Sequence, residues 1–391
     1  MRREEKSTFG LRRGTAGGGA RRAGRGGALL LALLFIFAHA QGEWTTLRGG
    51  EPPADTGFLV DEFSGSVTAT FLGDCTLGGE EKSRKSSLGY LRRIQENGTA
   101  FPMRYLKELT GTDDLTVANL EGVLTDRTLK KVEKKYNFSG PTAFTEILTS
   151  GGIDGVTLAN NHSHDYGEEG YADTISALER AGIGWFGTGD TAVWSNEEGL
   201  KIGFIGVSFS LSGNRYTRYQ RQMEALRSMG CAAVITVMHA GTEYSYEPDR
   251  TQRMIARRAI ACGTDLVIGH HPHVVQGYEV IDGVPVVYSL GNCSFGGTTR
   301  AKDSDALAVQ AEMIFEESRL QEVRLRFYPL SITSDPHYNN YSPRFLTGKD
   351  AERVFRKMKD STGLDPSPQA GTAGTDAPAP DGAEEGDGGR T

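Results

Sequence analysis

The stretch GVTLANNHSHDYGEEGYADTISAL, residues 155–178, places a turn rich in Asn, His and Asp between a strand and a helix. Gly155–Ala159 is apolar and β-branched, which favours a buried strand, and Tyr171–Ala181 has the pattern of a helix. In open α/β sheets, ligands bind outside the carboxyl ends of the strands. Asn161, His162 and Asp165 therefore stand where an α/β protein places a functional site.

The same organisation continues in both directions along the chain. Further strands are expected in the apolar runs 66–72, 115–118, 201–208, 232–238 and 266–268, and helices near 144–149, 221–229 and 249–261. Strands that alternate with helices predict a buried, largely parallel sheet. After His273 the pattern changes to two antiparallel hairpins: 274–281 with 284–290 around Asp282-Gly283, and 306–315 with 320–328. The fold class is α/β, with mixed sheets and helices outside.

Five predicted strands end in side chains that can bind metal. Besides Asn161 and His162, these are Asp74, Glu121, His239, His271 and His273. Each one alone is commonly a turn carboxylate, a helix cap or a hydrogen-bonded core histidine, but five such segments together favour a metal site. Carboxylate, amide and imidazole ligands suit Mn, Fe or Zn better than Ca or Mg. We expect one or two divalent ions, with Asp74 or Glu121 bridging two.

Both ends of the chain have a different composition. Residues 1–40 combine a basic, Gly-rich start, the apolar run 28–37 and the small-x-small sequence Ala38-His39-Ala40, which predict a signal peptide cleaved after Ala40. An uncleaved membrane anchor is the alternative. We interpret 41–61 as a linker, 62–360 as the folded domain and 361–391 as a disordered acidic tail rich in Gly, Pro and Ala.

The charge excludes one class of partner. The chain has a net charge of −7, and loss of residues 1–40, which carry eight basic and two acidic side chains, would make it −13. An acidic protein without a basic patch is a poor candidate for nucleic-acid binding. Because a signal peptide is predicted, we expect an exported protein that is extracellular or associated with the cell envelope.

Six segments, quoted in order, resemble the CapA family of capsule and poly-γ-glutamate synthesis proteins. They are FLGDCTLGG, VANLEGVLT, the stretch 155–178, MHAGTEYSYEP, GTDLVIGHHPHVVQGYEV and VYSLGN. The resemblance covers about 67–292 and implies the calcineurin-like metallophosphoesterase fold, an αββα sandwich, for the folded domain.

The resemblance also implies roles for individual residues. His162 would be the catalytic imidazole, oriented by Asp165. The implied metal ligands are Asp74, Glu121, Asn161, His239, His271 and His273, with Asn119 as an alternative to Glu121 and with His270 outside the ligand set.

Two departures from the wider phosphoesterase pattern accompany the resemblance. Cys75 and Thr76 follow Asp74, so the usual Asp-x-His is absent, and Glu121 replaces an aspartate. One ion would then be weakly or differently bound, which puts phosphatase activity in doubt. Cys75 and Cys293 both follow segments expected at one sheet edge, and we hypothesise a disulfide between them, with two buried thiols as the alternative.

Three functions are consistent with these features. The first is a metal-dependent hydrolase that acts on an anionic extracellular polymer, or its precursor, in capsule or poly-γ-glutamate biosynthesis, with membrane capsule-synthesis proteins as candidate partners. The second is a non-catalytic factor that grips the polymer through metal during assembly or export. The third is a general secreted metallophosphoesterase.

Overall fold

The computed structural model describes residues 37–39, 42–50 and 62–366. The basic start of the predicted signal peptide, its cleavage site, the second half of the predicted linker and the tail from 367 onward lie outside the described residues. Within the described part of the chain, no helix is both long enough and apolar enough to cross a membrane.

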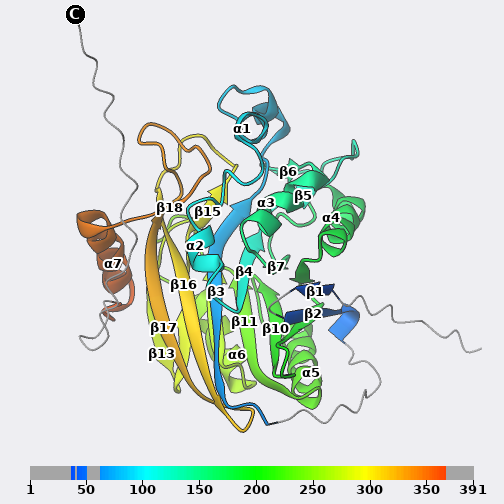
Figure 1. Ribbon diagram of the computed structural model, residues 1–391, viewed down its shortest axis with the longest axis vertical. Coiled ribbons are helices and arrows are strands. Elements are labelled where there is room, and N and C mark those ends of the chain that lie inside the picture. The colour runs from blue at the N-terminus through cyan, green and yellow to red at the C-terminus, as the bar shows by residue number, and fades with distance from the viewer. Residues whose placement is uncertain (1–36, 40–41, 51–61, 367–391) are drawn as a thin grey trace, which may run out of the picture. The chain divides into compact units, whose positions relative to one another are not determined.

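Two sheets form the centre of the fold (Figure 1), and each has eight strands among the described residues. The first has the order β1 (Phe37–His39), β2 (Gly42–Leu47), β9 (Thr191–Ser195), β10 (Lys201–Ser208), β11 (Cys231–His239), β12 (Leu266–His270), β14 (Val284–Val287), β13 (Tyr278–Ile281). The second has the order β18 (Arg344–Phe345), β17 (Arg319–Ser331), β16 (Asp305–Glu316), β3 (Gly65–Thr76), β4 (Leu115–Leu120), β7 (Gly155–Thr157), β8 (Gly184–Phe186), with β15 (Asn292–Phe295) beside β3. A separate pair consists of β5 (Val123–Leu124) and β6 (Ser139–Gly140).

The sheets pack face to face, and helices cover their outer faces. Side chains from both sheets, such as Phe71 of β3 and Ile235 of β11, share the central core. The second sheet is covered by α1 (Tyr90–Asn97), α2 (Lys107–Thr110), α3 (Thr145–Ser150) and α4 (Gly167–Ala181). The first is covered by α5 (Asn214–Ser228) and α6 (Arg250–Ala261), and α7 (Gly348–Thr362) packs beside β17 and β13. The predicted αββα sandwich is confirmed.

The predicted strands are present, but they divide between the two sheets. β3, β4, β7 and β8 run parallel in one sheet, and β10, β11, β12 and β14 run parallel in the other. Both predicted hairpins form. Asp282 and Gly283 have φ values of 50° and 83°, the left-handed conformation that a tight hairpin turn requires.

The linker prediction is wrong for 42–47, which form strand β2. Trp44 of this strand is buried, and its indole lies over Gly155 and Gly184, where any side chain would collide with it. Burial of a large aromatic side chain offsets the entropy of ordering a short segment. Strands β8 and β9 and helix α7, which sequence patterns did not predict, complete the same sandwich. The prediction of a disordered tail is wrong for 361–362, which belong to α7, because Ser361 is buried and accepts a hydrogen bond from Gly277 N at 2.9 Å.

The carboxyl ends of the parallel strands from both sheets meet at one place. Asp74 N donates to Gly291 O at 3.0 Å, and Leu290 N donates to Gly269 O at 3.2 Å. These bonds join the end of β3 and the end of β12 through the segment that leads into β15. Loops from two different sheets can therefore share one site.

Candidate metal centre

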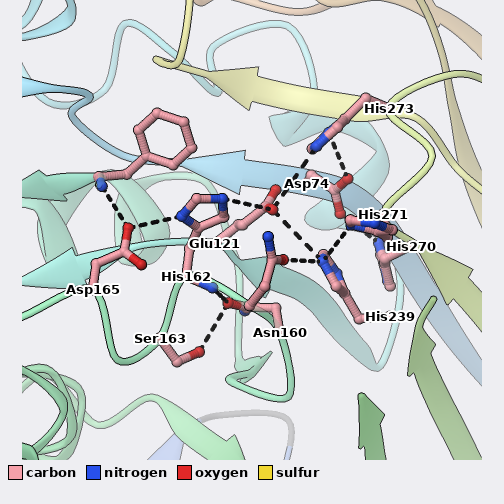
Figure 2. A network of polar contacts seen from close by, with 12 residues as sticks. Asp74, Glu121, Asn160, His162, Ser163, Asp165, His239, His270, His271 and His273 are labelled. Atoms are coloured by element: carbon pink, nitrogen blue, oxygen red, sulfur yellow. Dashed lines mark hydrogen bonds and ion pairs between the residues drawn. The ribbon is translucent and has the colours of Figure 1, made fainter. Parts of the chain in front are cut away.

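Eight side chains predicted from the sequence meet at this place, and Figure 2 labels all of them except Asn161. Each lies near the end of a parallel strand or in the loop that follows it. They are Asp74, Glu121, Asn161, His162, Asp165, His239, His271 and His273.

Glu121 lies at the centre of the group. Its carboxylate is fully buried, and neither oxygen accepts a hydrogen bond from any residue that the structure describes. Oε1 lies 3.6 Å from His239 Nε2, 3.9 Å from His162 Nε2 and 4.0 Å from His273 Nε2. Burial raises the pKa of Glu121 to about 8, despite the opposing charge of His273. A buried carboxylate without donors is costly unless a cation balances it, so the residues fit a metal.

Two sets of ligand atoms share this carboxylate. Glu121, His239 and His271 form one set, and Asp74, Glu121 and His273 form the other. Within each set, one ligand atom per residue lies within 4.8 Å of the others. The geometry can therefore hold one ion, or two ions bridged by Glu121.

The first set is rich in imidazole nitrogen. His271 Nδ1 lies 3.1 Å from His239 Nε2, and Asn161 Oδ1 lies 2.7 Å from the same nitrogen. Burial lowers the pKa of His239 well below its ordinary value and that of His271 to about 4. Both rings are therefore neutral near pH 7, which is the form that binds metal.

The second set is richer in oxygen. Asp74 Oδ2 lies 3.2 Å from His273 Nδ1, and Asp74 Oδ1 lies 3.1 Å from His270 Nδ1. Burial favours the neutral form of Asp74, but hydrogen bonds to these two histidines hold its pKa well below the usual range. Burial works against the charge of His273 too, yet Glu121 and Asp74 raise its pKa to about 10. Asn292 Oδ1 lies 2.9 Å from the same nitrogen, Nδ1, of His273.

The backbone is strained where the paired histidines enter the site. His271 and His273 have φ values of 99° and 57°, in the region that favours glycine. Such conformations cost about 1–3 kcal/mol each and cluster at functional sites. Phe209 also has a positive φ, 57°, and its ring lies edge-on to His271 with the centroids 4.9 Å apart.

His162 and Asp165 form a polar pair beside the ligand sets. His162 Nδ1 lies 2.7 Å from Asp165 Oδ2, and its Nε2 faces Glu121. Burial lowers the pKa of His162, while Asp165 acts against this. The ring packs on Phe138 with the centroids 4.4 Å apart. This arrangement holds one imidazole nitrogen and presents the other to the centre.

Two asparagines organise the loops instead of facing an ion. Asn119 Nδ2 donates to Asp74 Oδ1 at 2.8 Å, and Asn119 Oδ1 accepts from Asn160 Nδ2 at 2.9 Å. Asn160 Oδ1 accepts from the His162 backbone N at 2.9 Å. Both ends of the Asn119 amide are thus occupied, which favours Glu121 over Asn119 as the acidic ligand.

The hypothesis of a disulfide is not met in the structure. Cys75 and Cys293 are free and buried, and a hydrogen bond between them is the largest cause of the raised pKa of the Cys293 thiol. Both side chains pack in the apolar cluster beneath the helices of the second sheet. The alternative of two buried thiols describes them, and Cys75 does not replace the missing histidine at the centre.

The sequence did not identify three residues that contact the site. Lys134 contacts His162 and Asp165, Asn292 holds His273, and Phe209 lies against His271. Asn292 lies in the quoted segment VYSLGN, so the resemblance offered a signal for it. Lys134 lies in a charge-rich segment without periodicity, and no pattern distinguishes it from its neighbours.

Comparison with known protein families decides the relationship. A model for the bacterial capsule synthesis protein PGA_cap matches residues 68–296, more than half of the chain. The chain belongs to the PGA_cap family. The match begins in β3 and ends just after β15, so it contains every residue of the candidate centre.

Individual relatives agree with the family. The chain is 26% identical to the capsule biosynthesis protein CapA of Bacillus anthracis over 323 residues, which cover 76% of this chain and 74% of that protein. It is 27% identical to the PGA biosynthesis protein CapA of Bacillus subtilis (strain 168) over 260 residues, 61% of this chain and 66% of that one. A probable polyglutamine synthesis accessory protein of Mycobacterium tuberculosis (strain CDC 1551 / Oshkosh) is 28% identical over 165 residues, 34% of this chain and 43% of that protein.

Proposed function

We propose that this protein acts in the synthesis or processing of capsular poly-γ-glutamate or a related anionic polymer, through a divalent-metal centre at the strand ends. The names of the Bacillus relatives support the polymer. The observation that carries the metal centre is Glu121, a buried carboxylate that has no donor among the described residues and is shared by two sets of ligand atoms.

The donor set narrows the choice of ion. Carboxylate oxygen with imidazole nitrogen suits Mn, Fe or Zn, and the shared carboxylate allows one or two ions. A bound ion would supply Lewis acidity that polarises the bond to be cleaved and stabilises developing negative charge.

The side chains of the protein would perform the proton transfer. His162 Nε2 faces the centre, while Asp165 holds Nδ1. An imidazole fixed in this way can donate a proton to a leaving group. This pair favours a hydrolase over a factor that only grips the polymer.

Metal analysis tests the centre itself. Purified protein should retain Mn, Fe or Zn, and His271→Ala should lose at least one equivalent. His337→Ala is a matched control, because His337 is exposed and has no contact with the centre. Equal metal content in wild type and His271→Ala would contradict the proposal.

Polymer formation in a host that lacks its own copy of the protein tests the role. We expect His162→Ala to retain metal but fail to restore polymer. If His162→Ala restores polymer and His271→Ala does not, the centre grips polymer without catalysis. If the wild type hydrolyses simple phosphate esters with Mn and does not affect polymer, the protein is a general phosphoesterase.

Export is part of the proposal and rests on residues 1–40. The basic start and apolar run support a signal peptide that is cleaved after Ala40. Mass spectrometry of the protein from the culture medium or envelope should then give an N-terminus at Gln41. An envelope-bound chain that begins before residue 28 would instead indicate an anchor.

A further inference from the structure

A short segment between β5 and β6 lies over the His162–Asp165 pair, and we call residues 132–138 the strap. Val132 N donates to Asp165 O at 3.0 Å, and Phe138 N donates to Asp165 Oδ2 at 2.6 Å. The Phe138 ring packs on His162. Because β5 and β6 pair with each other, the segment that contains the strap is closed at its base.

Lys134 of the strap contacts three residues of the site: Asn161, His162 and Asp165. The Lys134 ammonium forms an ion pair with Asp165 Oδ1, donates to Asn161 O at 2.7 Å and lies 3.2 Å from His162 Nδ1. Asp165 is fully buried, whereas 28% of the Lys134 side chain is exposed. The lysine thus brings a positive charge to a carboxylate that solvent does not reach.

The donor and acceptor roles are determined by chemistry. An ammonium only donates and a carboxylate only accepts. Asp165 Oδ2 therefore accepts a hydrogen bond from His162 Nδ1–H, with the two atoms 2.7 Å apart. Asp165 Oδ1 forms the ion pair with the Lys134 ammonium. With both oxygens committed, the carboxylate cannot rotate without losing a partner. The His162 ring is then fixed with Nε2 toward Glu121.

The adjacent lysine provides a contrast. Lys135 is exposed, and its ammonium lies 4.8 Å from the centroid of the Tyr136 ring. The two lysines have the same side chain and adjacent positions in the strap, but only Lys134 is directed at the functional pair. Lys135 is therefore a matched control for a general effect of charge or of strap stability.

We infer that Lys134 is a positioning residue that locks Asp165 and, through it, the orientation and tautomer of His162. The catalytic consequence rests on the proposed function, but the positional claim does not. Loss of Lys134 should leave the metal ligands in place and release the imidazole.

Nitrogen NMR of the imidazole rings tests the positional claim without turnover. In the full, zinc-loaded chain with labelled histidine, His162 should show one tautomer with hydrogen on Nδ1, assigned by comparison with His162→Gln. Lys134→Met should give a mixture of tautomers, and Lys135→Met should keep the wild-type pattern. An unchanged His162 pattern in Lys134→Met overturns the inference.

A double-mutant cycle covers the case in which Lys134→Met folds poorly, because it leaves a buried carboxylate without its cation. Lys134→Met, Asp165→Asn and the double variant are compared by urea unfolding. If the two groups form a pair, Lys134→Met should have a smaller effect in the Asp165→Asn background. The factor by which it changes the unfolding equilibrium constant should be at least tenfold smaller there than in the wild type. Additive effects would show that Lys134 does not act through Asp165.

Metal content and kinetics separate this inference from the proposed function. Lys134→Met should bind as many zinc ions as the wild type; loss of zinc would assign Lys134 to the Asn161 loop and contradict the inference. With any substrate that the wild type turns over, kcat should fall at least tenfold with KM within twofold, and Lys134→Arg should recover most of the loss. If the wild type turns over no substrate, the hydrolase proposal fails, and the NMR result still decides the role of Lys134.

Discussion

Carboxylates at the two ends of the parallel strands differ in their hydrogen bonding. At the amino ends, Asp114, Asp154 and Asp265 each accept a backbone hydrogen bond from the neighbouring strand at 2.7 Å, from Thr68 N, Thr116 N and Val234 N. At the carboxyl ends, both Glu121 oxygens are buried, and no hydrogen bond reaches them from the described residues.

This difference separates carboxylates that hold the sheets from those available for chemistry. A partly buried carboxylate that accepts a backbone hydrogen bond satisfies a donor of the neighbouring strand, whereas a fully buried carboxylate without donors costs free energy in the absence of a cation. Two sheets show the same arrangement at their amino ends, so it is a property of the strands and not of one loop. Changes at the two ends should therefore affect different measurements.

The largest effect is expected from Glu121→Gln. The substitution keeps the shape but removes the charge shared by both ligand sets. We expect metal affinity to fall at least about 100-fold, about 2.7 kcal/mol, as measured by titration calorimetry with Zn or Mn. The metal-free variant should be at least as stable as metal-free wild type, because it no longer buries a carboxylate without donors.

The control for this prediction is Asp265→Asn, at the opposite end of a strand. It should leave metal affinity within a few-fold of the wild type. If Glu121→Gln bound metal normally, or if both substitutions reduced affinity equally, the distinction between the two ends would be lost.

A smaller effect, on stability and not on metal binding, is expected from Asp154→Ala. Thr116 N loses its acceptor at the start of β4, and a donor left without a partner costs about 1–3 kcal/mol. Urea unfolding should show this loss, while metal content stays at the wild-type value. A loss of metal in a variant that remains folded would show that the amino ends also shape the centre.

The sequence predicted the strands because their pattern is strong. Lys201–Ser208 was predicted with the bounds that β10 has, since six apolar, β-branched or small residues, 202–207, lie between a lysine and a serine. Strands such as β8, with three residues, offer too short a pattern, and β2 depends on one buried tryptophan and on glycines far along the chain. Short elements stabilised by distant contacts leave little local signal.

The sequence predicted which residues form the candidate centre but not how they contact one another. Placing polar residues after strands identified Asp74 and Glu121, because parallel strands carry their ends to one edge. It could not show that Glu121 belongs to both ligand sets, since this depends on two sheets meeting. Lys134 was missed for a related reason: its role comes from the path of the strap across His162.

The smallest expected effect concerns an exception to the contrast. Asp113, at the amino end of β4, is buried; its Oδ2 accepts from Thr116 Oγ1 at 2.6 Å, but Oδ1 has no partner among the described residues. Burial raises the pKa of Asp113 to about 6, above the roughly 3.9 of an unfolded chain. Between these values the folded state binds more protons, so this group makes stability fall as pH rises from about 4 to 6.

Asp113→Asn should therefore flatten the pH dependence of stability. Compared by urea unfolding in metal-free protein, the wild type should lose on the order of 1 kcal/mol more than Asp113→Asn between pH 4.5 and pH 7. Metal-free protein is used because the ligand groups then titrate alike in both proteins and cancel. If the wild type instead gained stability relative to the variant over this range, the folded state would favour the charged form of Asp113, and burial would not dominate the pKa of this carboxyl group. The expected result would show that burial makes the Asp113 carboxylate costly to ionise; burial raises the pKa of Asp154 to about 6 as well, although Asp154 accepts a backbone hydrogen bond.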